Sequence, residues 1–240
     1  MKKIIVLRST VIVLFFSLVL GCNISVEKKE QLSEVEQLYN QGQYTNALNI
    51  ARFNLSKNPK DPASIITVWK IQVIQSTKSF DFVQQFYFLA QPKVRESGSP
   101  LIPYLGKALL NDRQNAVRLF CLYCLSEFQD TVSTNYIIRI FEPNNTLGDK
   151  SGNITLEILR MEAATILAGR QYTPVFDHLV TLAGSQDQEI RARAVTAMGI
   201  LGDKRAIPVL EKMTGDPYGQ GSVRSVAEIA DSALAKIKRR

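Results

Sequence analysis

Four segments of the chain begin with an aliphatic residue followed by arginine, and they recur at a nearly regular interval. The arginines are Arg118, Arg160, Arg191 and Arg224, which lie 42, 31 and 33 positions apart. The segments that these four arginines mark are called copies one to four, in chain order. Self-similarity at such an interval is typical of stacked helical pairs, in which each pair buries its apolar face against its neighbours. The sequence therefore predicts an all-α fold, an α-solenoid of stacked helical hairpins.

The third of these segments has the most distinctive sequence. Residues 189–203 read Glu-Ile-Arg-Ala-Arg-Ala-Val-Thr-Ala-Met-Gly-Ile-Leu-Gly-Asp, and Arg-Ala-Ile-Pro-Val-Leu follows at 205–210. Pro208 falls near the start of the second helix, where the backbone N–H groups are unpaired in any case. Over about residues 101–238 the chain resembles HEAT and HEAT-like repeats.

The HEAT resemblance also implies a role for one loop residue of the repeat. Asp203 matches an aspartate that in this family caps the following helix or bonds to a neighbouring arginine. Asp130 falls in the same column of copy one, whereas copy two has Tyr172 there. The resemblance thus implies a cap or an Asp–Arg contact in copies one and three, and Tyr172 argues against a continuous Asp–Arg ladder through copy two.

The part that precedes the HEAT-like repeats is also helical in its apolar periodicity. It resembles a degenerate tetratricopeptide repeat, whose unit is a helical hairpin of about 34 residues. The early Trp and Leu-Gly positions of that unit are not matched. The residues that carry the resemblance are Gly42, Tyr44, Ala47 and Pro59.

The N-terminus has the pattern of a secretory signal. Lys2, Lys3 and Arg8 precede the apolar run 11–20, which is shorter than the roughly 20 residues that cross a bilayer. The run ends in Val-Leu-Gly and then Cys22, which resembles the bacterial lipobox. This resemblance implies cleavage before Cys22 and acylation of its thiol, and two or three acyl chains anchor a protein stably. A membrane helix with an incidental cysteine is the alternative.

The resemblances together predict the location and the domain organisation. The protein is expected to be exported and lipid-anchored in the cell membrane or the outer membrane, with its folded part facing the periplasm or the cell surface. The predicted parts are a removed signal (1–21), the lipidated cysteine and a short tether (22–30), tetratricopeptide-like hairpins (31–96), a breaker-rich linker (97–100) and HEAT-like repeats (101–240).

The charge balance and the residue types argue against several functions. The formal charge is +7, and removal of Lys2, Lys3 and Arg8 leaves 26 − 22 = +4, too mild an excess to require a nucleic-acid partner. His178 is the only histidine, which excludes a multi-histidine metal site and the usual Ser-His-Asp arrangement. We therefore expect no catalytic site, metal, cofactor or small-molecule substrate.

Cys121 and Cys124 form a C-x-x-C motif, which in an exported protein suggests a redox pair or a disulfide. The repeat alignment favours a different interpretation, because it places both cysteines in columns of small apolar residues where helices pack. An intrahelical disulfide remains the alternative. The aligned residues are Ala163, Ala194 and Ala227 for Cys121, and Ile166, Ala197 and Ala230 for Cys124.

These features predict a non-catalytic scaffold that binds a protein partner in the bacterial envelope. The second helices of HEAT-like pairs commonly line a binding surface, and the outward-facing candidates there are Arg139, Asp177 and Lys212. Two alternatives remain: a structural brace of an envelope assembly, and an accessory subunit of an envelope enzyme.

Overall fold

The structure is a computed structural model that describes residues 34–76, 79–145, 154–216 and 225–239. Those residues contain helices and turns and no β-strand, as the sequence predicts. No helix among them is long and apolar enough to cross a bilayer. The predicted signal and Cys22 lie outside the described residues. The chain divides into two compact units, Met1–Ile71 and Gln72–Arg240.

The first unit contains a helical hairpin with a tight turn. Residues 34–40 are helical, and α2 (Tyr44–Lys57) follows a turn at Gly42, whose φ of +76° suits glycine. The rings of Tyr39 and Tyr44 meet edge-on with centroids 5.7 Å apart, so Tyr44 packs against the turn. The predicted hairpin is therefore present, while its likeness to a tetratricopeptide repeat stays a prediction. The unit boundary falls inside the next helix, α3 (Pro62–Gln75).

The second unit is a succession of helical pairs. Short 3-10 turns (η) join several of the helices. In chain order the elements are α4 (Phe80–Ser97), η1 (Ser99–Leu101), α5 (Ile102–Asn111), α6 (Asn115–Ser126), α7 (Thr131–Ile138), η2 (Arg139–Phe141), α8 (Leu156–Gly169), η3 (Thr173–Val175), α9 (Phe176–Ala183), α10 (Gln188–Leu201), η4 (Lys204–Ala206), α11 (Ile207–Met213) and α12 (Val226–Lys238).

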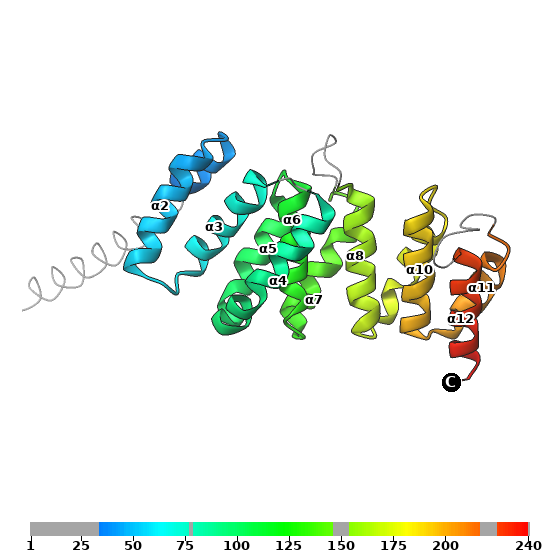
Figure 1. Ribbon diagram of the computed structural model, residues 1–240. Coiled ribbons are helices and arrows are strands. Elements are labelled where there is room, and N and C mark those ends of the chain that lie inside the picture. The colour runs from blue at the N-terminus through cyan, green and yellow to red at the C-terminus, as the bar shows by residue number, and fades with distance from the viewer. Residues whose placement is uncertain (1–33, 77–78, 146–153, 217–224, 240) are drawn as a thin grey trace, which may run out of the picture. The chain divides into compact units, whose positions relative to one another are not determined.

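The first helices of the pairs stack on one another along the unit. α4 packs on α6, α6 on α8, α8 on α10, and α10 on α12. Each second helix (α5, α7, α9, α11) packs on the first helix of the following pair, and Figure 1 shows this succession from α4 to α12. Gly199 illustrates how close the helices approach, because a Cβ built there would lie 3.0 Å from the Cβ of Ala233. The second unit is an α-solenoid in which each pair covers the next.

The array begins one helical pair earlier than the aliphatic–Arg pattern indicates. Residues 101–105 read Leu-Ile-Pro-Tyr-Leu and resemble Ala-Ile-Pro-Val-Leu at 206–210. In both stretches a 3-10 turn leads into a helix with proline in its first turn. The predicted linker at 97–100 is the turn between α4 and α5, inside the second unit, where Gly98 has a φ of +69°.

Aromatic side chains hold α4 against α6. The ring centroids of Phe86 and Phe120 are 5.2 Å apart, and those of Tyr87 and Tyr123 are 5.4 Å apart. Glu127, just after α6, accepts hydrogen bonds from the Tyr87 hydroxyl and from Gln91 and Arg95 of α4. Aromatic pairs of this kind add to the area they bury. The aromatic residues of α4 that face α6 are therefore part of the core.

Candidate functional site

Arg118, the arginine of copy one, is fully buried and joins three segments. Its Nε donates to the carbonyl of Leu109 at 2.8 Å, one Nη donates to Asn115 Oδ1 at 3.3 Å, and the other Nη donates to Asn145 Oδ1. These partners belong to the end of α5, the start of α6 and the loop after η2. Burial lowers the pKa of Arg118 to about 10, although the nearby Asp112 opposes this shift.

Arg191, the arginine of copy three, makes the equivalent contacts with a charged partner. Its Nε and one Nη bind the two carboxylate oxygens of Asp216 at 2.8 and 3.3 Å, and both side chains are almost fully buried. The other Nη donates to the carbonyls of Ser185 and Gln186 at 3.0 and 3.1 Å. Arg191 thus ties the loop before α10 to the loop after α11. Arg118 ties the end of α5 to the loop after η2 in a similar way.

Within the described residues, copies two and four show no arginine that binds the flanking loops in this way. The Nε of Arg160 is buried and has no hydrogen-bond partner. Arg224 lies outside the described residues. The repeated arginine is therefore a structural residue in copies one and three, and its role is to fix the loops rather than to bind a partner.

The Asp–Arg contacts implied by the HEAT resemblance are present in copy three. Asp203 accepts from the backbone N–H of Arg205 at 2.9 Å and from its guanidinium at 2.7 Å. The hydrogen bond from the Arg205 side chain is the main reason that the pKa of Asp203 is lowered. In copy one Asp130 caps α7 by accepting from the N–H of Ser133 at 2.9 Å.

In copy two, where Tyr172 takes the place of the aspartate, Arg170 and Gln171 make the contacts with the neighbouring copies. Arg170 donates to the carbonyl of Phe128 at 2.6 Å and to the hydroxyl of Thr134 at 2.6 Å, both in copy one. Gln171 adopts a φ of +58° and donates to the carbonyl of Ile200 at 3.2 Å, in copy three. Neighbouring copies are therefore linked here by side chain–backbone bonds rather than by an Asp–Arg ladder.

Cys121 and Cys124 are thiols that form no disulfide, and both are fully buried inside α6. Burial is the main reason that the pKa of Cys124 is raised, and the neighbouring Cys121 adds to it. A buried thiol in apolar surroundings is unreactive. The arrangement agrees with the interpretation of both cysteines as core residues.

His178 stacks on a neighbouring ring. Its imidazole and the ring of Phe141 have centroids 4.1 Å apart at an interplanar angle of 19°. Burial and then the positive charge of Arg160 lower its pKa, so the imidazole is held neutral near pH 7. Nowhere in the described residues do three or more His, Cys, Asp or Glu side chains gather so that they could hold a metal ion.

The three predicted partner-binding residues all lie on the second-helix side and are exposed. Arg139 starts η2 at the end of α7, where it forms an ion pair with Glu142 at 3.2 Å. Asp177 lies in the first turn of α9, and Lys212 lies in the last turn of α11. The structure places them on successive pairs, and their role in binding stays a prediction.

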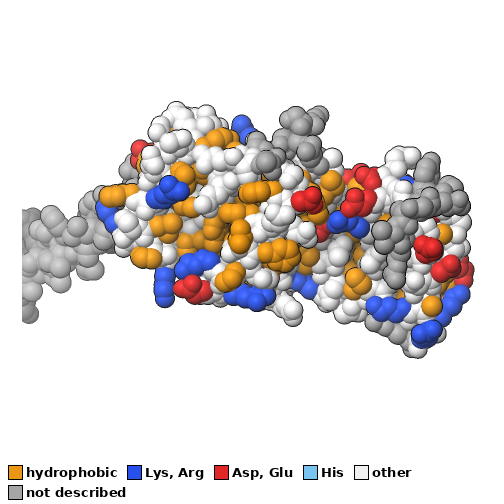
Figure 2. All heavy atoms as spheres, in the orientation of Figure 1, with side chains coloured by type: hydrophobic (Ala, Val, Ile, Leu, Met, Phe, Trp, Pro, Cys, Tyr) orange, Lys and Arg blue, Asp and Glu red, His pale blue; other side chains and the backbone are white. Residues whose placement is uncertain are grey.

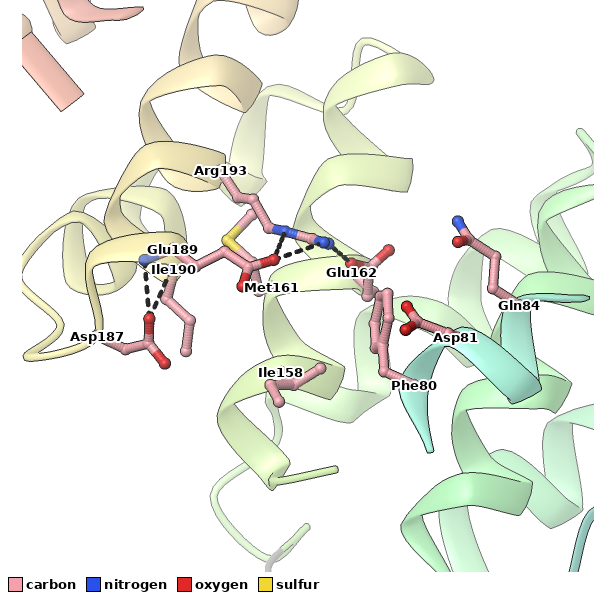
Figure 3. A pocket seen from close by; sticks show the side chains of 10 residues that line it. All are labelled: Phe80, Asp81, Gln84, Ile158, Met161, Glu162, Asp187, Glu189, Ile190 and Arg193. Carbon is pink, nitrogen blue, oxygen red and sulfur yellow. Dashed lines mark hydrogen bonds and ion pairs between the residues drawn. The ribbon is translucent and has the colours of Figure 1, made fainter. Parts of the chain in front are cut away.

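A pocket on the first helices is a site that the sequence analysis missed. Its volume is about 360 Å³, and its walls come from the start of α4, from α8 and from the start of α10 (Figure 3). Four carboxylates, one guanidinium and four apolar side chains contribute to it. The lining residues are Phe80, Asp81, Gln84, Ile158, Met161, Glu162, Asp187, Glu189, Ile190 and Arg193.

Arg193 crosses this pocket and is held from both sides. It forms ion pairs with Glu162 of α8 and, at 2.9 Å, with Glu189 one turn earlier on α10. Its guanidinium carbon also lies 5.1 Å from the ring centroid of Phe80, a cation–π contact with α4. Figure 2 shows acidic and basic side chains gathered in this way on the part of the surface that holds α8. Three first helices are therefore joined at this point by one arginine.

Glu162 is the buried carboxylate of the pocket. Burial raises the pKa of Glu162, and this effect exceeds the opposing influence of Arg193. Tyr123 of α6 lies against Glu162, and burial and then that carboxylate raise the pKa of its hydroxyl. The buried Tyr123 hydroxyl therefore has the Glu162 carboxylate as a polar neighbour.

The pocket could not be found by reading motifs, because its walls come from three separate stretches. Asp81 and Glu162 are 81 positions apart, and Arg193 follows 31 positions later. The one sequence signal for the pocket was Arg193, the second arginine of copy three, because the aliphatic–Arg pattern does not require an arginine there. Its position two residues after Arg191 places it on a different face of α10.

The comparisons with known proteins cover part of the second unit. No curated protein matches the chain. Residues 156–230, which include α8 to α11 and the start of α12, match the model of the HEAT repeat family. This match supports the HEAT-like repeats predicted from the sequence, and such repeats generally form non-catalytic scaffolds that bind other proteins.

Proposed function

We propose that the protein is a lipid-anchored scaffold of the bacterial envelope that holds a protein partner on its HEAT-like array. The residues up to Cys22 motivate the anchor, because they resemble a lipobox. The match of residues 156–230 to HEAT repeats motivates the partner class. The proposal includes no catalytic step, because the described residues contain no group of side chains to which a particular reaction can be assigned.

The observation that carries the proposal is the fixing of loops by buried arginines. Arg118 and Arg191 each bind polar groups of the loops that flank their helix, which a chain needs if its helical pairs are to keep one mutual arrangement. A surface that is already ordered loses little conformational entropy when a partner binds. A helical array with ordered loops is therefore suited to hold a partner.

The partner is proposed to lie on the second-helix side. Arg139, Asp177 and Lys212 are exposed there on successive pairs and carry charges of both signs. Exposed charges of this kind set the orientation and the rate of association more than the affinity. The proposal therefore predicts that charge reversal on this side weakens capture of the partner without unfolding the array.

The experiment is chemical crosslinking with mass spectrometry in native cells. The wild type is compared with Cys22→Ser and with the triple variant Arg139→Glu/Asp177→Lys/Lys212→Glu. A matched control reverses three exposed charges on first helices with the same net change: Lys93→Glu/Glu157→Lys/Lys236→Glu. Lys93 is a close match for Arg139, because it also forms an ion pair with a glutamate three positions later, at 3.1 Å.

The scaffold proposal predicts one dominant envelope partner in the wild type and in the control variant. That partner should be lost in Cys22→Ser, and its crosslinks should fall in the triple variant. A wild type without any specific partner would overturn the scaffold. Unchanged crosslinks in the triple variant would overturn the assignment to the second-helix side and leave the scaffold in place.

A further inference from the structure

We propose that the pocket between α4, α8 and α10 is a second docking site, which takes an arginine or lysine side chain flanked by apolar residues from a protein partner. This inference rests on the proposed scaffold function and adds a surface on the opposite set of helices. The occupant follows from the charge of the pocket, from its apolar walls and from Asp81, which pairs with no described residue.

The charge of the pocket is opposite to that of the chain. Four carboxylates line it against one guanidinium, a net charge of 1 − 4 = −3, whereas the chain carries +7. The single guanidinium, that of Arg193, is already paired with two of the carboxylates. Two carboxylates, Asp81 and Asp187, remain for an incoming cation.

These two acids are available in different ways. Asp81 is exposed in the first turn of α4 and makes no hydrogen bond or ion pair with the described residues. Asp187 caps α10 through one oxygen, which accepts from the N–H groups of Glu189 and Ile190 at 2.8 and 3.4 Å. Figure 3 shows Asp81 and Asp187 on opposite walls of the pocket. A long cationic side chain that enters between the walls can pair with either carboxylate.

The remaining walls suit the residues that flank a cation. Ile158, Met161 and Ile190 contribute apolar surface between the two acids. The aliphatic stem of arginine or lysine, or an adjacent leucine, can cover such surface while the charged head meets the carboxylates.

The test uses two labelled heptapeptides that differ in one residue. Both carry a central triplet flanked by Gly and Ser residues. The triplet is Leu-Arg-Leu in one peptide and Leu-citrulline-Leu in the other. Citrulline keeps the shape of arginine and removes its charge. Binding to the detergent-solubilised full chain is followed by fluorescence anisotropy. We expect the arginine peptide to bind about tenfold more tightly, with a preference that declines as salt is added.

The decisive variant is Asp81→Asn/Asp187→Asn. It leaves the ion pairs of Arg193 intact, and asparagine caps a helix about as well as aspartate does. We expect the preference for arginine over citrulline to fall about fivefold or more. The matched control, Glu157→Gln/Asp231→Asn, removes two exposed carboxylates that do not line the pocket, and it should keep the wild-type preference.

Three results would overturn the docking site: equal affinity for the two peptides, an unchanged preference in Asp81→Asn/Asp187→Asn, or an equal loss in the control. Tighter binding of a Leu-Glu-Leu peptide would also overturn it, because Arg193 would then be the group that recognises the partner. If the docking site fails while the envelope crosslinks of the wild type persist, the scaffold function stands and the pocket alone is rejected.

Discussion

Copies one and three of the array solve the same problem with different chemistry. Arg118 is fully buried, and its hydrogen-bond acceptors among the described residues are neutral: Leu109 O, Asn115 and Asn145. Arg191 is also buried but faces a carboxylate, Asp216, that pairs with it through both oxygens. Burial lowers the pKa of Arg118 to about 10. The repeat thus requires a buried guanidinium with several acceptors, while the charge that balances it can come from elsewhere.

The largest effect is expected from removing the arginine of copy one. Arg118→Leu leaves the carbonyl of Leu109 and the amides of Asn115 and Asn145 without their buried donor, and it leaves Asp112 without the nearby cation. Breaking a buried charged network in this way costs about 3–5 kcal/mol of the free energy of unfolding. Urea unfolding followed by circular dichroism measures the loss. A loss below about 1 kcal/mol would show that copy one does not depend on its arginine.

A smaller effect is expected from removing the partner in copy three. Asp216→Ala leaves Arg191 with its acceptors in the loop before α10, the carbonyls of Ser185 and Gln186. Because part of the network survives, the expected loss is about 2–3 kcal/mol in the same urea experiment. The conservative variant Asp216→Asn should recover about half of it, since the amide oxygen still accepts from the guanidinium. Full recovery by asparagine would mean that charge is unimportant in copy three as well.

A third variant gives Arg118 of copy one a carboxylate partner, as Arg191 of copy three has in Asp216. Asn145→Asp supplies a carboxylate to Arg118, but it removes the amide that donates to the carbonyl of Arg139 at 3.3 Å. The new ion pair and the lost donor oppose each other, so the free energy of unfolding should change by less than about 1 kcal/mol. The pKa of Arg118 should rise. A loss above about 2 kcal/mol would show that Asp112 already neutralises Arg118.

The smallest effect concerns the acids at the ends of the first helices. Burial raises the pKa of Glu127, but hydrogen bonds from Gln91, Tyr87 and Arg95 outweigh it and hold the pKa below its ordinary value of 4.5. The stabilisation by Glu127 is therefore present above pH 4.5 and is lost as the pH falls through the lower folded pKa. Glu127→Gln should reduce the slope of stability against pH in that acidic window, by less than about 1 kcal/mol in total.

Asp203, which follows α10 in copy three, supplies the parallel case for this pH experiment. Asp203 also has a lowered pKa, caused mainly by its hydrogen bond from Arg205. Asp203→Asn should therefore change the acidic slope in the same direction as Glu127→Gln. Opposite directions in the two variants, measured by thermal unfolding between pH 3 and 6, would contradict the assignment of both carboxylates as stabilising when ionised.

The sequence predicted the repeats well where one residue type has one structural role. The aliphatic–Arg pairs at Arg118 and Arg191 mark helices whose buried arginines bind the neighbouring loops. The pair formed by α4 and α5 escaped this pattern because its first helix has no arginine at that place: Val83 is followed by Gln84. The similarity of its second helix to residues 206–210 lies in apolar residues and a proline, which many helices share.

The pocket shows the limit of sequence reasoning for the candidate site. Asp81, Glu162 and Asp187 each have a plain local explanation, as residues in the first turn, in the middle and at the cap of their helices. Only the stacking of α4 on α6, α6 on α8 and α8 on α10 turns these residues into one acidic surface. Their shared chemistry is a property of the tertiary packing, which no short motif encodes.

The two neighbouring residues at the end of α8 have a mechanical consequence. Arg170 holds the loop of the preceding copy, and Gln171 holds the end of the first helix in the following copy. A torque applied at one end of copies one to three is therefore carried in part by this dipeptide, in addition to the helix packing. Replacement of both side chains by alanine would make this stretch of the array more compliant to twisting while leaving its apolar core unchanged, so that stiffness and stability could be varied separately in one molecule.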